Sequence, residues 1–534
     1  MLRKRSTALL VLTAMLLAVL LTACGAPPAV EEQQKEPESE AQESLEPRYG
    51  GVLKTTINSD PGSLDMHLEG SEQAQIPGCH VFETLLAQDT KGNAHPLLCS
   101  YEVKEDGLVI ELTMRENVKF HNGDVMDIDD VMASINRWLN TVSSAKSMVG
   151  NKLESLTAVD DKTIVFKFKE PAPLALTAMS TFDRGPYVMP KEIIEKYGDQ
   201  KITEYIGTGP YKFVEHLADR HIKLERFEDY QAVENDADGM AAPRRAYVDE
   251  IYFIPVKDKM TRITGVQTGD YDVGIGVPSN LYPTLKEDPN LKVVMQDMEI
   301  FPTMVLNYEE GPTTDIKLRQ AILACLDMEE LMIAAEGDPD FFYLHPCFMP
   351  KSSAFWNDAG SDKYNNPDPE RAKKLLEESS YNGETLIYIT TKDFDYFYKT
   401  ALLASDMMRK VGINVDLQVV DNATLGQLRN DPSAYSMFSA GLTSKPDPTL
   451  IAFMEDGWAG FYKSEKKSHY YNILTTEFDP KTRMQAWREM SEVLYEEVPA
   501  ITFGERKVAT VTNKKVNNLF EGTKKYYWNT WVSE

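Results

Sequence analysis

The sequence lacks the short motifs by which common hydrolases and nucleotide-binding enzymes are recognised. None of HExxH, GxSxG, GxxxxGKS/T or GxGxxG occurs along its 534 residues. Its eight histidines include no pair spaced four apart for a helical metal site, and His216 and His221 are five apart. Carboxylates are abundant, but no pattern nominates a pair for glycoside hydrolysis. We therefore expect no catalytic residue, no metal and no cofactor.

Basic residues and cysteines are also scarce. Lysine and arginine number 56 against 83 acidic residues, a formal net charge of −27. This charge argues against binding nucleic acid or anionic lipid, although a local pocket can carry the opposite sign. Five cysteines occur without a CxxC spacing. Cys79, Cys99, Cys325 and Cys347 follow Cys24, and in an exported protein they could form two disulfides or stay buried thiols.

Long apolar runs are absent except at the amino terminus. Residues 7–23 are almost wholly apolar and follow three basic residues, a pattern typical of a secretory signal. The run ends in Leu21-Thr22-Ala23-Cys24, which resembles the lipobox of bacterial lipoproteins. The resemblance implies a signal peptide over 1–23 and a lipid on Cys24 that holds the chain on the extracytoplasmic side of the cell membrane. An uncleaved anchor or an ordinary secretion signal is the alternative.

Residues 24–48 are predicted to be a disordered linker. Residues 25–48 hold seven glutamates, four prolines and no aromatic residue, so they cannot bury enough apolar surface to fold. Removal of the signal takes away three positive charges and moves the formal charge from −27 to −30. The remaining chain is long enough for two or three packed domains.

Beyond residue 48 the pattern alternates strands and helices. Strands are predicted at 52–57, 108–114 and 163–169, and a helix over 127–140 begins with Asp127 as its cap. Asp368-Pro369 opens another helix. Residues 385–390, 396–410 and 413–420 form a strand, a helix and a strand, and such a crossover indicates a parallel pair. The predicted fold class is α/β.

Several short sequence motifs, spread over nearly the whole chain after the linker, resemble those of one family. They are Gly51-Val52-Leu53 with Asp60-Pro61-Gly62-Ser63-Leu64-Asp65, Val118-Lys119-Phe120-His121-Asn122-Gly123-Asp124 with Asp130-Val131, Gly207-Thr208-Gly209-Pro210-Tyr211, Asn307 with Lys317-Leu318-Arg319-Gln320-Ala321 and Asp327, Lys410-Val411-Gly412-Ile413, and Asp447-Pro448. In this order they are similar to the family 5 solute-binding proteins of ABC importers, the dipeptide, oligopeptide and nickel group.

The resemblance implies a two-lobed clamshell with a small extra domain. The first lobe would comprise 49–81, 206–306 and 503–534, the extra domain 82–205 and the second lobe 307–502. Such a protein captures a small solute, here a short or modified peptide, and delivers it as a monomer to a permease and ATPase complex. A nickel chelate, an opine or a glycoside as solute, or a role as ligand sensor, is the alternative. A secreted hydrolase is the alternative that the sequence supports least.

Most family motifs also have a structural interpretation. Gly207 and Gly209 are expected to supply backbone angles that a side chain would forbid. His121 is expected in a hairpin. Arg319 and Asp327, predicted on one helix, are expected to stabilise the fold rather than to contact solute.

Ligand contacts are expected on loops that face the cleft. The loop after the first strand offers Asp65, Met66 and His67. The loop before the helix at 396 offers Lys392, Asp393 and Tyr396, with Lys392 near the place where dipeptide-binding members have an arginine for the substrate carboxylate.

A second group of candidates lies at 437–448 and beyond. Peptide-binding members have a Trp and an acid here that hold the bound peptide, and this chain has Gly441 and Ser444 in those places. Thr443 and Asp447 complete this segment. An ammonium group buried without a carboxylate is costly, so another acid, Asp447 or Asp65, would have to replace the missing one. Trp458, between glycines, is expected to stack on solute.

Overall fold

The computed structural model describes residues 46–298, 300–520 and 525–533. The predicted signal peptide, Cys24 and the linker up to residue 45 lie outside the described residues. From Pro47 onward the chain forms one compact unit. Within the described ranges, no helix combines the length and the apolar character needed to cross a membrane.

The first sheet has the strand order β12-β19-β11-β1-β10-β9-β8, and β14 also pairs with β19. β1 runs parallel to β10 and β11, and the other pairs are antiparallel. We call this sheet and its helices the first lobe. Its strands are β1 (Val52–Ile57), β8 (Tyr211–Leu217), β9 (His221–Arg226), β10 (Glu250–Pro255), β11 (Val273–Val277), β12 (Leu291–Asp297), β14 (Phe342–Tyr343) and β19 (Glu505–Asn513), and its helices are α1 (Glu72–Val81), α6 (Lys259–Thr268) and α7 (Tyr282–Lys286). A short pair, β20 (Val516–Asn517) and β21 (Trp531–Val532), follows β19.

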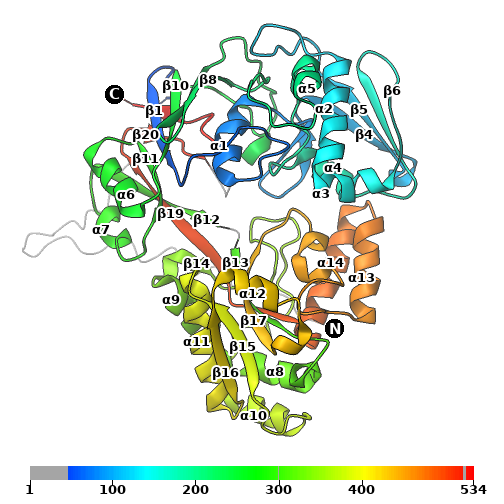
Figure 1. The fold of residues 1–534 in the computed structure, drawn as a ribbon, viewed down its shortest axis with the longest axis vertical. Helices are drawn as coiled ribbons and strands as arrows, with labels where there is room; N and C mark the ends of the chain where they lie inside the picture. Colours follow the sequence, from blue (N-terminus) through cyan, green and yellow to red (C-terminus); the bar gives the residue numbers. More distant parts are fainter. Residues whose placement is uncertain (1–45, 299, 521–524, 534) are drawn as a thin grey trace, which may run out of the picture. The chain divides into compact units, whose positions relative to one another are not determined.

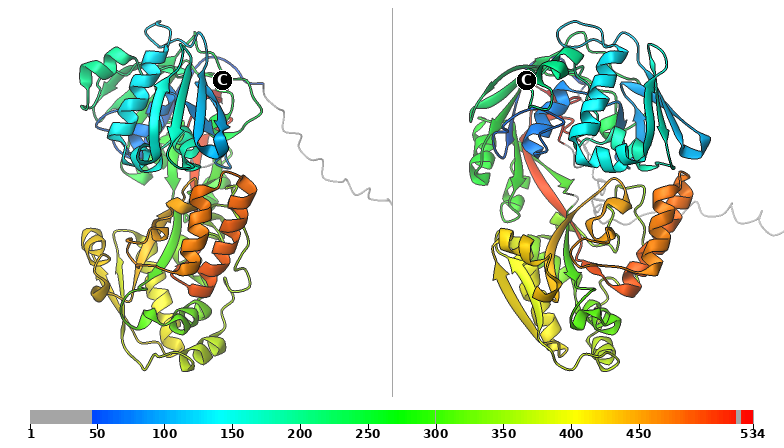
Figure 2. Two further views of the ribbon diagram at one scale, coloured as in Figure 1. Left: turned by 90° about the vertical axis from the view of Figure 1, so that its right-hand side faces the viewer. Right: turned by 45° about the vertical axis from the view of Figure 1, so that its right-hand side comes forward.

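The small domain is built on an antiparallel sheet of order β4-β5-β7-β6. Inward-facing residues of these strands pack with helices into one apolar core around Trp138 and Phe166, and Figure 2 shows the helices of this domain beside its sheet. Its elements are β2 (Leu86–Gln88), β3 (Ala94–Pro96), β4 (Cys99–Lys104), β5 (Val109–Met114), β6 (Leu153–Ala158), β7 (Thr163–Phe168), α2 (Ile128–Thr141), α3 (Ser143–Met148), α4 (Leu174–Ser180) and α5 (Lys191–Tyr197).

The second sheet has the order β16-β15-β17-β13-β18. Its strands carry apolar side chains on both faces, and two separate cores form on them. We call this sheet and its helices the second lobe. Its elements are β13 (Ile300–Leu306), β15 (Leu386–Thr391), β16 (Val415–Val420), β17 (Met437–Thr443), β18 (Ala500–Thr502), α8 (Ile316–Cys325), α9 (Met328–Glu336), α10 (Pro369–Glu377), α11 (Asp395–Lys410), α12 (Asn422–Leu428), α13 (Glu465–Thr476) and α14 (Pro480–Glu497).

Two of the connections between the sheets run directly from one strand to the next. One passage joins β12 to β13 and the other joins β18 to β19, and both can be followed in Figure 1. β13 falls within the range expected for the first lobe but pairs with β17 and β18 of the second sheet. Its sequence IFPTMVL is apolar on both faces, which suits a strand covered on both sides. The predicted domain ranges otherwise stay a prediction.

Most predicted elements are confirmed. β1, β5 and β7 lie within a residue of their expected bounds. Asp127 caps α2 by accepting the N–H groups of Asp129 and Asp130, and Asp368 caps α10. The 385–420 unit contains β15 and β16 in parallel with α11 between them. Arg319 and Asp327 do not share one helix as predicted: Arg319 lies on α8, and Asp327 caps α9. Arg319 is buried and donates to backbone carbonyls, so both residues stabilise the second lobe.

The prediction for Gly207 and Gly209 was wrong in its reason. Neither residue has a positive φ. Instead, a Cβ at either position would collide with backbone of His80 and Val81 at the end of α1, so the glycines permit close backbone approach. His121 lies in its expected turn, and its Nε2 is 2.9 Å from the carbonyl oxygen of Gly209.

Candidate functional site

A cavity of about 1360 Å³ is bounded by both lobes and by the small domain. It exceeds the range of about 300–1,000 Å³ that is common for small-molecule pockets, so it has room for an extended solute. The passages between the lobes form part of its wall through Ile300, Arg506 and Lys507. Other wall residues include Lys257, Arg262 and Gly276 from the first lobe, Thr90 and Phe182 from the small domain, and Glu336, Phe394 and Leu450 from the second lobe.

The charge of this wall differs in sign from that of the whole chain. Nine lysines and arginines and seven aspartates and glutamates line the cavity, whereas the chain carries a net −27. Because a concave, partly dry surface strengthens electrostatic interactions, a local excess of positive charge matters more than the global sign. The wall therefore suits a solute that bears both signs of charge.

Arg506 and Glu336 form an ion pair in the cavity wall. Arg506 Nε donates to Glu336 Oε1 at 2.5 Å, and Nη2 donates to Oε2 at 3.2 Å. The guanidinium also lies 4.2 Å from the ring centroid of Tyr396. Burial raises the pKa of Tyr396, so its hydroxyl remains a hydrogen-bond donor at neutral pH. Arg506 is on β19 and Glu336 ends α9, so the pair joins a passage strand to the second lobe.

Four of the predicted contact residues lie in the cavity wall. They are Asp393, Tyr396, Thr443 and Ser444. Since β15 runs parallel to β17, the loops that follow these two strands meet at one edge of the second sheet. Asp393 Oδ2 accepts the N–H of Asn422 at 2.7 Å, which fixes the first of these loops.

Lys392 and Gly441 do not line the cavity. The Lys392 ammonium lies 4.5 Å from the ring centroid of Tyr398. A Cβ at Gly441 would be 2.5 Å from the hydroxyl of Tyr396. Gly441 therefore makes no direct contact with solute. Its lack of a side chain leaves room for the ring of Tyr396.

Asp447 and Trp458 also lie away from the cavity wall. Asp447 is 1% exposed, forms an ion pair with Arg483 and accepts the N–H of Thr449 at 3.0 Å. Its carboxylate is thus already used inside the second lobe. Trp458 is half-buried against Phe438, with ring centroids 5.8 Å apart, and so contributes to packing.

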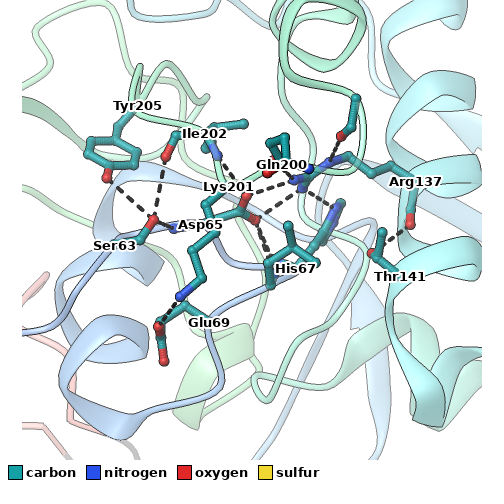
Figure 3. A network of polar contacts seen from close by, with 12 residues as sticks. Ser63, Asp65, His67, Glu69, Arg137, Thr141, Gln200, Lys201, Ile202 and Tyr205 are labelled. Carbon is teal, nitrogen blue, oxygen red and sulfur yellow. Dashed lines mark hydrogen bonds and ion pairs between the residues drawn. The ribbon is translucent and has the colours of Figure 1, made fainter.

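The middle of the loop after β1, Asp65 to His67, is a buried structural network, whereas Asn58 and Gly70 at the two ends of this loop line the cavity. Asp65, Met66 and His67 are each 0% exposed, and none of them lines the cavity. Arg137 Nη2 donates to Asp65 Oδ2 at 2.7 Å and Nη1 donates to Oδ1 at 3.0 Å. Figure 3 shows this pair with His67 and with the chain at Ile202, whose N–H reaches the same carboxylate. Asp65, Met66 and His67 were predicted to contact solute, but their side chains have no exposed surface to offer.

The four cysteines after Cys24 are buried free thiols. Burial raises the pKa of Cys99 and of Cys325 to about 12, so these thiols stay protonated and unreactive. The two disulfides left open by the sequence are therefore not formed. Over the described ranges, no cluster of His, Cys, Asp and Glu side chains is arranged to hold a metal ion.

Sequence reasoning missed most of the charged wall. Lys257, Lys259 and Arg262 sit at the start of α6, and Arg506 lies far along the chain. In the sequence Lys257, Lys259 and Arg262 share one polar stretch and Arg506 stands next to Lys507, which is typical of a solvated surface. Only the pairing of β11, β12 and β19 brings them to one cavity.

Known proteins resemble this chain in sequence. A family model described as bacterial extracellular solute-binding proteins, family 5, matches residues 93–460. A protein named a probable peptide ABC transporter periplasmic-binding protein, from Sinorhizobium fredii, is 27% identical over 475 residues, covering 85% of this chain and 89% of that protein. The oligopeptide-binding protein AppA of Bacillus subtilis is 26% identical over 464 residues, covering 81% and 79%.

Solved structures resemble it in fold. The ABC transporter substrate-binding protein CtaP of Listeria monocytogenes superposes with a TM-score of 0.77 at 19% identity, covering 91% of this chain and 100% of that one. The AppA structure from Bacillus subtilis superposes with a TM-score of 0.68 at 20% identity, covering 92% and 100%. These likenesses confirm the two-lobed α/β fold. With the family match over more than half of its length, the chain belongs to the bacterial extracellular solute-binding proteins of family 5.

Proposed function

We propose that the protein captures a short peptide in the cavity and delivers it to the permease of an ABC importer without altering it. The observation that supports this most is a cavity of about 1360 Å³ whose wall comes from both lobes and from the strands between them. Two sequence relatives carry names of peptide-binding transport proteins. Three fold neighbours hold peptides, one of them the dipeptide Met-Leu and another a nonapeptide.

Other fold neighbours hold agropinic acid or a nickel–histidine complex. The cavity volume favours a peptide over these smaller solutes, because a wall built for a small solute would leave most of this space unfilled. Capture would follow from contact with both lobes at once. A solute that contacts both lobes binds the closed arrangement of the lobes more tightly than the open one. It shifts the population towards the closed arrangement by this difference in affinity.

Asp395 is the acid that we propose for the peptide's amino group. Asp65 and Asp447 are each committed to an arginine. Asp395 is the first residue of α11, lines the cavity and forms no hydrogen bond or ion pair through its carboxylate with any described residue. It directly follows the loop that meets Ser444, where the resemblance gives peptide-binding members their acid. The missing acid is thereby replaced from the neighbouring strand end.

The test is binding of peptides with free and with acetylated amino groups to the purified chain. Free peptides are expected to raise the melting temperature and to reduce the radius of gyration in small-angle scattering. Asp395→Asn should weaken the free peptides about tenfold, as expected for a lost charge-assisted hydrogen bond, and leave the acetylated peptides unaffected. Asp416→Asn, an exposed aspartate on β16, is the matched control. Absence of any thermal shift or compaction with peptides would contradict peptide capture.

Attachment to the membrane through Cys24 is part of this proposal and rests on the sequence alone. Cys24→Ala should move the chain from the detergent phase to the aqueous phase in Triton X-114 partitioning, while peptide binding is unchanged. An unaltered distribution would point to the alternative anchor. Sedimentation of the Cys24→Ala chain is expected to show a monomer.

A further inference from the structure

Arg262 is a buried guanidinium in the cavity wall. It is 3% exposed and belongs to α6, and it donates from Nε to the carbonyl oxygen of Ile275 at 3.0 Å and from Nη1 to that of Val256 at 2.6 Å. Its third nitrogen, Nη2, has no hydrogen-bond acceptor among the described residues. Nη2 lies over Gly276, another wall residue, at 3.5 Å from the place of a Cβ. One edge of the guanidinium is therefore unused beside the cavity.

The charge of Arg262 has no counter-ion within ion-pair distance in the described parts of the chain. The carboxylate whose charge acts on it is that of Asp258. Asp258 is exposed and is occupied at the start of α6, where it accepts both the N–H and the hydroxyl of Thr261 at 2.8 Å. A buried cation without an anion is unfavourable, and burial lowers the pKa of Arg262. An anionic ligand group would relieve this cost.

Gln296, on β12 of the first sheet, supplies a second unused donor. It is 5% exposed, lines the cavity, and its Oε1 accepts the hydroxyl of Thr510 at 2.7 Å. Its amide nitrogen Nε2 has no hydrogen-bond partner. Thr510 is paired with Ile275, the residue whose carbonyl Arg262 holds, so Gln296 and Arg262 reach neighbouring positions of the first sheet.

Two lysines add positive charge beside these donors. Lys257 and Lys259 flank Asp258, are exposed, line the cavity and form no ion pair with a described acid. By contrast, Arg506 is paired with Glu336 and Lys525 with Glu72. Lys392, where the resemblance suggested a carboxylate partner, does not line the cavity. The start of α6 is thus the part of the wall with the largest unpaired positive charge around a buried donor.

We propose that Arg262, Gln296, Lys257 and Lys259 form a carboxylate-binding subsite on the first lobe. The subsite rests on the proposed function and takes the terminal carboxylate of the captured peptide. With Asp395 on the second lobe for the amino group, it gives the peptide a fixed direction across the cavity. Each lobe then binds one end of the peptide.

The test compares two peptide pools on the purified full chain. Both contain tetra- to octapeptides of Ala, Gly, Leu, Ser and Phe, so the only carboxylate is terminal, and one pool is amidated at that end. Native mass spectrometry gives the bound fraction. The amidated pool is expected to bind about tenfold more weakly, as for the loss of a hydrogen bond to a charged group. Equal binding of the two pools would overturn the subsite and leave peptide capture standing, whereas binding of neither pool would overturn the proposed function as well.

Isosteric variants locate the effect. Gln296→Glu places a negative charge beside the peptide carboxylate and keeps the acceptor for Thr510, so free-acid peptides should lose about tenfold in affinity. Gln88→Glu, at another wall glutamine whose Nε2 is also unpaired, makes the same change in the small domain and should cost less than about threefold. Equal losses for both variants would contradict the location.

A pair of double variants covers the case in which Gln296→Glu does not fold. Lys257→Ala with Lys259→Ala removes two exposed lysines from the subsite, and Lys399→Ala with Lys445→Ala removes two from the second-lobe wall. The first pair should weaken the free-acid pool and reduce its advantage over the amidated pool, and the second should leave that advantage in place. The reverse result would overturn the assignment.

Discussion

Two arginine–carboxylate pairs in this protein have similar chemistry and different surroundings. Arg137 and Asp65 are 2% and 0% exposed in their side chains and lie inside the fold. Arg506 and Glu336 are 17% and 7% exposed and line the cavity. The first carboxylate also accepts the backbone N–H groups of His67 and Ile202, whereas the second pair leaves an aromatic ring, Tyr396, beside its cation.

The difference in burial between the two ion pairs indicates which pair maintains the fold and which can respond to solute. A fully buried, fully hydrogen-bonded pair cannot release either partner without a large cost. A pair at the edge of a solvated cavity can exchange its partner for water or for a ligand group at little cost. We therefore expect substitutions in the first pair to change stability, and substitutions in the second to change binding.

The strongest test is the same substitution in both pairs. Arg137→Met leaves the Asp65 carboxylate buried without its cation, so the free energy of unfolding should fall by about 3–5 kcal/mol. Arg506→Met leaves Glu336 next to the cavity, where water can reach it, and should cost about 1 kcal/mol. Urea denaturation of both variants measures the difference. Equal losses would show that burial does not separate the two pairs.

The pH dependence of stability sharpens the same comparison. Burial, helped by the nearby charge of Arg137, lowers the pKa of His67 to about 3, and burial lowers that of His80 to about 3. The ordinary value is 6.5, so between about pH 6.5 and 3 the unfolded chain binds protons that the folded chain does not. Stability is full above this window and falls as the pH drops, by about 1.4 kcal/mol per pH unit for each histidine.

Asp65 extends this loss to lower pH. Burial alone would raise its pKa, but the hydrogen bond and charge of Arg137 outweigh burial, and the pKa is lowered from 3.8. The stability that this carboxylate contributes is therefore lost only below about pH 4, as the group becomes protonated.

The histidine contribution is tested with His67→Gln by denaturant titrations between pH 7 and pH 4.5. The free energy of unfolding should change less steeply with pH in this variant than in the parent chain, by the amount that corresponds to one proton. His469→Gln, an exposed position on α13, is the control, and an unchanged slope in His67→Gln would refute the assignment.

Local patterns carried the prediction of the fold. Alternating runs such as TIVFKF formed strands and Asp127 and Asp368 formed caps because these depend on a few neighbouring residues. The family motifs supplied the order of the lobes. The position of β13 was harder to predict, because an apolar strand fits either sheet until its partners are known.

The site was only half predictable, for a physical reason. Asp393, Tyr396, Thr443 and Ser444 follow strands, and strand ends reach a common edge in any α/β sheet. Asp65 has the same sequence signature of an acid after a strand, but Arg137 comes from another domain and covers it. No spacing along the chain reveals such a partner, and none reveals that Arg506 and Arg262 share a cavity.

A neutral residue at Glu336 tests whether the cavity pair responds to solute. Glu336→Gln keeps the shape and leaves the positive charge of Arg506 unopposed in the wall. We expect peptides with a glutamate side chain to gain about threefold in affinity relative to peptides with a lysine at the same position, since one nearby charge at a hydrated site contributes under about 1 kcal/mol. Calorimetric titration of the two peptides gives the ratio. Asp65→Asn, by comparison, should lower stability and leave the ratio as it is; a constant ratio in Glu336→Gln would place the pair among the structural ones.

The smallest expected effect concerns Gly441, which connects packing with the cavity wall. Its backbone φ is not positive, so alanine is allowed there by conformation. The added Cβ would lie 2.5 Å from the hydroxyl of Tyr396 and 3.3 Å from the ring of Phe397, so both side chains would have to shift. Because Tyr396 lines the cavity, Gly441→Ala should cost about 1 kcal/mol of stability and shift peptide affinity. Tyr396→Phe in the same chain removes the colliding oxygen, so the double variant should recover most of that stability. If the two losses simply add, the contact between Gly441 and Tyr396 does not set the position of the ring, and the separation between packing residues and wall residues at this sheet edge is complete.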